Sequence, residues 1–330
     1  MARTDARYNV TELRGLACLL LVAYHTVGVP GSGMHVGDDS LYRYLTSSFE
    51  LIRMPLFTFI SGYVYAARPV REGMLKVFFG KKVRRLLLPF VIVSTVFYLL
   101  QTAAPGSNGN DAPEEMWRIY VFSYAHLWYL QALFLIFAVV GVADAFGLLA
   151  TPRAFALGFA LALVAFFAID TEANPWSANE AATLLPHFLL GVAVRRFADT
   201  FRQPRVWALA PLGLAVGLAV HQASLLHLVP FHIGWKSGVA LLCGMGGALT
   251  LLRVMPSSGV MRTVGEASYA IYLYHTFFTA AVRIVLVRLG WQADLLVFAT
   301  SLTAGIMGPM IVEALAVQRP WSRVALVGRA

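Results

Sequence analysis

The recurrence of apolar stretches of about 20 residues most constrains how this chain can fold, because such a stretch crosses the roughly 30 Å hydrocarbon layer of a membrane as one helix. These stretches follow one another along the whole chain, with short polar connections between them. Hydrophobic residues make up 58% of the sequence and charged residues 13%, a composition outside that of soluble domains. The sequence therefore predicts an all-α, polytopic membrane protein.

The hydropathy pattern predicts ten transmembrane helices within one integral membrane domain that spans residues 1–330. We expect no appended soluble domain, because no polar stretch approaches the roughly 50 residues that a small domain needs. The expected helices are 12–30, 44–66, 86–104, 126–146, 154–170, 180–197, 205–221, 234–253, 266–288 and 293–315.

Basic residues indicate which connections face the cytoplasm, where Lys and Arg concentrate. With the amino terminus inside, 19 Lys and Arg residues lie in inner segments and only four, Arg43, Arg118, Lys236 and Arg288, lie in outer loops. Both termini are therefore expected in the cytoplasm, and the first helix is expected to stay uncleaved. The net charge of +9 then reflects topology and contact with anionic lipid, so no nucleic-acid partner is expected.

An arginine and a histidine lie on one face of the first expected helix. In ELRGLACLLLVAYH, Arg14 and His25 are eleven residues apart. That spacing is within about 20° of three full helical turns and rises about 16 Å. An ionisable group in hydrocarbon costs several kcal/mol unless it faces protein or water, so this face is expected to line a cavity. The alternative stays open that Arg14 reaches the lipid headgroups and that His25 is a hydrogen-bonded core residue.

Glu50 and Arg53 lie on the second expected helix, at a depth close to that of His25. A carboxylate at that depth fixes the tautomer of a neighbouring imidazole and stabilises its protonated form, which suits a general base. The alternative is an ion pair between Glu50 and Arg53, which are three residues apart. Farther along, Ser61 and Gly62 lie near the cytoplasmic side, where a missing side chain permits close approach of a ligand or another helix.

Four basic residues, Lys81, Lys82, Arg84 and Arg85, directly precede the third expected helix on the cytoplasmic side. Such clusters commonly set topology or hold anionic lipid. If the first three helices pack together, as short connections favour, the cluster is instead a candidate site for the phosphates of a cytoplasmic cofactor. Both interpretations stay open.

Two further stretches place polar and aromatic residues in apolar helices. HLWYLQALFLIF begins one expected helix at its outer end and contributes three residues that also fit an interfacial aromatic belt, His126, Trp128 and Tyr129. EASYAIYLYHTFF begins another at its inner end, and its three-residue spacing places on one side Tyr269, Tyr272 and His275. His275 is expected near the middle of the membrane.

The ordered set of these motifs resembles the acyltransferase 3 family of integral membrane O-acyltransferases, which modify bacterial surface polysaccharides. LRGLACLLLVAYH is similar to the family's first-helix motif, PLFTFISGYVYA to its phenylalanine-rich segment, and KKVRRLLLPF to its basic run before a proline. HLWYL and SYAIYLYH are similar to two later elements. The closing element departs from the family's pattern, because Gln318 precedes Arg319 and Pro320 where the family commonly has a glutamate, and the nearest acid is Glu313.

The resemblance implies that His25 is the catalytic histidine and Arg14 its essential companion, and Glu50 is expected beside them. The residues expected to bind the donor are Arg14, Ser61, Gly62, Lys82, Arg84, Arg85, Tyr269, Tyr272 and His275. Those expected to bind the acceptor are Arg53, His126, Trp128 and Tyr129.

The resemblance also implies acyl coenzyme A as a co-substrate, with acetyl as the commonest cargo, and no permanently bound cofactor. The expected acceptor is a hydroxyl of a carbohydrate or lipid-linked glycan, and the expected location is the cytoplasmic (inner) membrane of a bacterium. His25 then deprotonates the acceptor hydroxyl or carries the acyl group itself. Cys18 and Cys243 fall inside expected spans and are interpreted as packing residues, so no metal site is expected.

A transporter or flippase is the alternative function, because intramembrane His, Arg and Glu side chains also relay protons or bind anionic solutes. The basic cluster at the cytoplasmic end favours a cytosolic donor, and hence an enzyme. Release of free thiol from acyl-CoA in the presence of an acceptor distinguishes the two functions. The sequence leaves the oligomeric state open.

Overall fold

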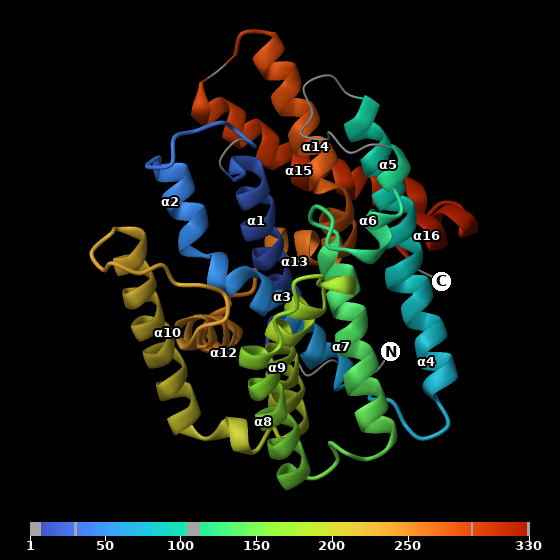
Figure 1. The fold of residues 1–330 in the computed structure, drawn as a ribbon, viewed down its shortest axis with the longest axis vertical. Helices are drawn as coiled ribbons and strands as arrows, with labels where there is room; N and C mark the ends of the chain where they lie inside the picture. Colours follow the sequence, from blue (N-terminus) through green and yellow to red (C-terminus); the bar gives the residue numbers. More distant parts are fainter. Residues whose placement is uncertain (1–7, 30–31, 104–112, 292, 329–330) are drawn as a thin grey trace. The chain divides into compact units, whose positions relative to one another are not determined.

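The computed structural model describes residues 8–29, 32–103, 113–291 and 293–328, which Figure 1 shows as a ribbon. Within these ranges the chain is helical and has no strand. Its α-helices are α1 (Val10–Val27), α2 (Leu41–Ser48), α3 (Glu50–Tyr65), α4 (Leu75–Lys82), α5 (Leu88–Ala103), α6 (Arg118–Val121), α7 (Trp128–Ala145), α8 (Pro152–Ala168), α9 (Ala178–Arg196), α10 (Pro204–Leu225), α11 (Gly238–Leu241), α12 (Gly247–Val254), α13 (Gly259–Glu266), α14 (Ser268–Arg288), α15 (Asp294–Ala316) and α16 (Pro320–Val327).

Six helical stretches among the described residues are long and apolar enough to cross a membrane. They are Val10–Val27, Leu75–Ala103, Trp128–Ala145, Pro204–Leu225, Ser268–Arg288 and Asp294–Ala316, and two shorter apolar stretches are Pro152–Ala168 and Gly238–Val254. Helices cover all ten segments expected from hydropathy. The all-helical class is confirmed, while the count of ten crossings and the cytoplasmic placement of the termini stay predictions.

Two of the expected helix boundaries differ from the structure. The segment 44–66 is not one helix, because the chain turns at Phe49 between α2 and α3. The third expected helix, 86–104, is part of a longer one, which begins at Leu75 with α4 and runs through a π-helical turn, Val83–Leu87, into α5. The basic cluster therefore lies inside a helix and not before one. Lys and Arg are good helix formers, so a helix continues through them although their charge ends the apolar run that hydropathy detects.

The chain divides into two compact units. Unit 1 comprises Met1–Ile60 and Ala198–Val312, and unit 2 comprises Ser61–Phe197 and Glu313–Ala330.

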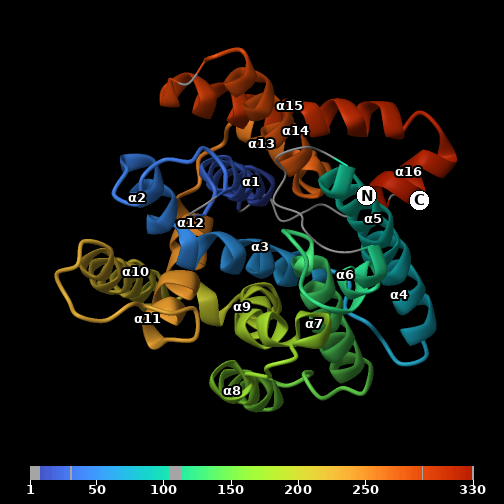
Figure 2. The same ribbon diagram turned by 45° about the horizontal axis from the view of Figure 1, so that its top comes forward.

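In unit 1, α1 packs closely against α13 and α14, as Figures 1 and 2 show. A side chain at Gly15 would overlap the carbonyl oxygen of Met261, so only glycine permits this approach of the two backbones. The buried carboxylate of Glu12 accepts a bond of 2.6 Å from Arg262 on α13. These contacts hold the first half of α1 in place.

In unit 2, α9 lies beside both α7 and α8 (Figure 2). Gly62 of α3 meets the backbone of Phe188 on α9 so closely that a side chain there would overlap its carbonyl oxygen. At the end of α7, Asp144 accepts bonds of 2.9 and 2.8 Å from Arg196 and one of 2.7 Å from the hydroxyl of Tyr65. This charged group ties together the ends of α3, α7 and α9.

Candidate functional site

The last turn of α1 carries His25, whose side chain is half-buried, as is that of Arg14 eleven residues earlier. The helix ends at Gly28, which has a positive φ of 76° and donates its N–H to the carbonyl of Tyr24 at 2.7 Å. Gly28 and Gly33 lie too close for a side chain on either one. The backbone that presents Tyr24 and His25 is therefore fixed by a tight glycine turn.

Two rings flank His25, and together with Arg53 they form what we call the ring cluster: Tyr24, His25, Arg53 and His275. The ring of His275, from α14, has its centroid 4.9 Å from that of His25. The ring of Tyr24 lies edge-on to His25 at 5.0 Å. His275 is fully buried, so this side of His25 is closed to water.

Within the ring cluster, Arg53 stacks on the ring of Tyr24. Its Cζ atom lies 3.4 Å from the centroid of the Tyr24 ring, and the residue is only 4% exposed. Its Nη1 atom has no hydrogen-bond partner among the described residues. A buried guanidinium over an aromatic face is held by cation–π attraction. The expectation that Arg53 binds the acceptor stays untested, but Arg53 plainly supports Tyr24.

Glu50 has a neighbour that the sequence analysis did not select. Its Oε1 lies 4.0 Å from Nε2 of His221, a fully buried residue of α10. The same Nε2 is 3.0 Å from the carbonyl oxygen of Ser47. Since a carbonyl only accepts, Nε2 of His221 carries the proton. The pairing of Glu50 with His25 therefore stays a prediction. The sequence did not reveal His221, because hydropathy does not show which residue of another helix lies beside Glu50.

The expected donor residues of α14 differ in exposure. Tyr272 and His275 are buried and Tyr269 is half-buried. All three lie in unit 1 with Arg14. Their role in donor binding stays a prediction.

The basic cluster of unit 2 separates into one inward and three outward side chains. Nζ of Lys82 lies 3.2 Å from the centroid of the Phe137 ring, and the residue is half-buried. Lys81, Arg84 and Arg85 are exposed. Helix α16 packs against the π-helical turn, where Gly328 touches the backbone of Arg85. The three exposed side chains lie on the surface of the protein.

Ser61 and Gly62, also expected near the donor, lie in unit 2. Ser61 is half-buried, and the contact of Gly62 with Phe188 matches the helix-packing interpretation of this motif. Glu313 is the acid nearest to the closing element, which differs from the family's pattern, and it is 9% exposed within α15.

The expected acceptor residues of unit 2 lie in or beside its core. His126 is 4% exposed and edge-on to Phe97, with centroids 5.7 Å apart. Tyr129 is buried, and the half-buried Trp128 lies edge-on to it at 5.9 Å. These contacts resemble core packing, and acceptor binding by these residues stays untested.

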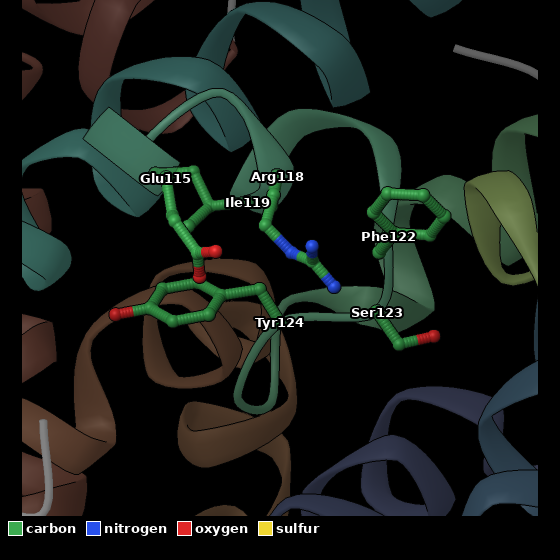
Figure 3. Close-up of a pocket in the computed structure, with 6 residues that line it drawn as sticks. All are labelled: Glu115, Arg118, Ile119, Phe122, Ser123 and Tyr124. Carbon is green, nitrogen blue, oxygen red and sulfur yellow. The ribbon is translucent and has the colours of Figure 1, made fainter. Parts of the chain in front are cut away.

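A hollow of about 180 Å³ in unit 2 is lined by residues between 115 and 124, which were not selected from the sequence (Figure 3). Glu115, Arg118 and the ring of Tyr124 face it, together with Ile119, Phe122 and Ser123. Arg118 has its Cζ atom 5.4 Å from the centroid of the Phe122 ring. The hollow thus offers a carboxylate, a guanidinium and aromatic rings. Sequence reasoning does not detect sites in turn-rich loops, because no periodicity marks them.

Among the described residues, no group of three His, Cys, Asp or Glu side chains is placed to hold a metal ion. The expectation of a metal-free site stays a prediction.

Comparison with known proteins identifies one relationship. A family model described as an acyltransferase domain matches residues 8–314, which is nearly the whole chain and includes the ring cluster. No curated protein and no solved structure matches the chain.

Proposed function

The chain belongs to the acyltransferase 3 family, and we propose that it transfers an acyl group, acetyl first among the candidates, from cytoplasmic acyl-CoA to a hydroxyl of a carbohydrate or lipid-linked glycan. Its apolar helices and its family make it an integral membrane acyltransferase. The proposal places it in the inner membrane of a bacterium.

The state of His25 is the observation that carries the proposal. An imidazole within an apolar helix is costly unless it is paired or functional. His25 is half-buried, so the residue is packed on part of its surface and exposed on the rest. The buried His275 and the Tyr24 ring hold the packed part. An imidazole that two rings hold in place, in a residue that is partly exposed, suits proton transfer to a bound substrate.

The reaction assigned to His25 is acyl transfer from sulfur to oxygen. The neutral imidazole takes the proton of the acceptor hydroxyl while the hydroxyl oxygen attacks the thioester carbonyl. A C–O bond forms, the C–S bond breaks, and the leaving thiolate of coenzyme A takes the proton back from the imidazolium. In the second route His25 attacks the thioester, and the acyl-imidazole then passes its acyl group to the hydroxyl. Both routes end with an ester, a free thiol and a neutral His25.

Donor phosphates are assigned to Arg84 and Arg85. Their position on the surface of the protein supports this, since a guanidinium makes bidentate contacts with phosphate. Lys82 is withdrawn onto Phe137 and is given a packing role. Arg14 is assigned to the part of the donor nearer the thioester, because it shares a helix face with His25.

Within unit 2, sugar binding is assigned to the hollow of Figure 3. A sugar offers hydroxyl groups to charged side chains and C–H faces to aromatic rings, and Glu115, Arg118 and Tyr124 provide these partners.

The test uses purified full-length protein in liposomes with acetyl-CoA that carries radiocarbon in its acetyl group. The glycan and lipid-linked glycan fractions of a bacterial envelope serve as acceptor, and free thiol and label in the glycan are measured together. The proposal expects both to increase in equal amounts. Passage of glycan across the liposome membrane with no thiol released would contradict it and favour the transporter.

A further inference from the structure

His275 has a hydrogen-bonding pattern that fixes its tautomer. Its Nδ1 lies 2.8 Å from the carbonyl oxygen of Ile271 and 3.0 Å from that of Tyr272. A carbonyl oxygen only accepts hydrogen bonds, so Nδ1 must carry a proton. In neutral His275 the lone pair is therefore on Nε2, at the far end of the ring from its own backbone.

The contact with His25 is of the right length for this lone pair to be used. Two imidazoles joined by a straight N–H···N bond of about 2.9 Å have ring centroids about 5.2 Å apart, and a bent bond brings them closer. The centroids of His25 and His275 are 4.9 Å apart, with their planes at 50°. The separation of the centroids therefore permits a hydrogen bond from an N–H group of His25 to Nε2 of His275.

The packing of unit 1 keeps the two rings at this separation. Near the start of α14, the carbonyl of Ser268 lies 3.8 Å from Sγ of Cys18 on α1. On α15, Gly305 leaves no room for a side chain between Val22 of α1 and Thr279 of α14. Helices α1 and α14 are therefore held together at two levels, and His25 and His275 face each other between them.

We propose that His275 is a positioning residue for His25, whose N–H it accepts at Nε2 during turnover. The inference rests on the proposed function and replaces the donor-binding role expected for His275. One nitrogen of His25 then carries the proton that is hydrogen-bonded to His275, and the other nitrogen is unprotonated and accepts the proton of the acceptor hydroxyl. When the unprotonated nitrogen takes the hydroxyl proton, the imidazolium is stabilised by the same bond to His275. The proton returns to the leaving thiolate, and the tautomer is restored.

The test compares two substitutions of His275. One keeps a hydrogen-bond acceptor for His25, and the other keeps only the hydrogen bond to the backbone of α14. His275→Gln places an amide oxygen near the position of Nε2 and so keeps the acceptor. His275→Asn places an amide nitrogen near the position of Nδ1, so it keeps the bond to Ile271 and loses the acceptor. The partners that orient functional histidines in metal sites cost roughly 10- to 100-fold when removed. We expect kcat to fall roughly 100-fold in His275→Asn and less than about 5-fold in His275→Gln, with the donor KM unchanged in both.

His187, buried in α9 of unit 2, provides the matched control. Its Gln and Asn variants should show no such contrast in kcat. A purely structural role of His275 would lower kcat equally in both variants, and a donor-binding role would raise the donor KM. Either result overturns the inference, as does an Asn variant that is as active as the Gln variant.

An independent measurement on the unaltered protein uses nitrogen NMR of labelled histidine side chains, with the His275 signals assigned from their loss in either variant. The inference expects a protonated Nδ1 and an unprotonated Nε2, and the opposite tautomer overturns it. Wild-type protein that releases no thiol would instead contradict the proposed function. Active wild-type protein with an unimpaired Asn variant would contradict the inference alone.

Discussion

Arg53 stacks on the ring of Tyr24, and the free energy of this interaction can be predicted and measured. Cation–π contacts contribute about 0.5–1 kcal/mol at exposed sites and about 2 kcal/mol when desolvated. Arg53 is 4% exposed and its Cζ atom lies 3.4 Å from the ring centroid, so the upper value applies. We expect a coupling free energy of about 2 kcal/mol between the two side chains.

The coupling is measured by a double-mutant cycle with Arg53→Met, Tyr24→Leu and the double variant. The Arg53 substitution alone is uninformative, because it also removes the cost of burying a charge, and such replacements are often neutral. The cycle cancels that contribution. The assay is the free energy of unfolding in detergent micelles, with kcat and acceptor KM measured on the same preparations.

The matched control is Arg195 over Tyr63, whose contact is longer, at 5.1 Å, and whose arginine is only half-buried. That pair should couple by about 0.5–1 kcal/mol. A coupling below about 0.5 kcal/mol between Arg53 and Tyr24 would refute the reasoning. If Arg53 supports the ring cluster, its loss lowers kcat, whereas a rise in acceptor KM alone would restore its expected role in acceptor binding.

Two further predictions concern unit 2. The double variant Arg84→Glu, Arg85→Glu should raise the donor KM at least roughly tenfold, since a charge-assisted contact is worth about 1.5–3 kcal/mol. The control variant Lys82→Met should leave the donor KM unchanged. If the double variant also leaves it unchanged, the two arginines serve only to set the topology. Asp144→Ala should lower the free energy of unfolding by about 3–5 kcal/mol, because it leaves the guanidinium of Arg196 largely buried without its carboxylate. Asp144→Asn should cost less, and equal stability of Asp144→Ala and wild type in a denaturant titration would show that this group does not hold the helix ends.

The helices were predictable because the apolar stretches are long, and a hydropathy average detects apolar stretches of that length. The break at Phe49 was not, since the apolar run continues across it into α3. The helical start at Leu75 was also missed, because the charges of Lys81 to Arg85 interrupt the apolar run without interrupting the helix.

The site was predictable only along each helix. The spacing of Arg14 and His25 placed both on one face, and depth along the helix placed His275 near mid-membrane. Hydropathy does not show which helices are neighbours, so the approach of His275 to His25 could not be foreseen. For Arg53 the sequence indicated an ion pair with Glu50 or a role in acceptor binding, and it did not indicate the contact with the face of the Tyr24 ring that the structure shows.

Substitution of His25 tests the central claim most directly. His25→Ala and wild-type protein are compared at equal amounts in membranes, with acetyl-CoA as donor and envelope glycan as acceptor. Proton transfer by a positioned side chain contributes roughly 10²- to 10⁴-fold, so thiol release and glycan acylation should fall at least 100-fold while membrane insertion is unchanged. A variant that inserts normally and keeps the full rate of transfer would remove His25 from the mechanism and contradict the account.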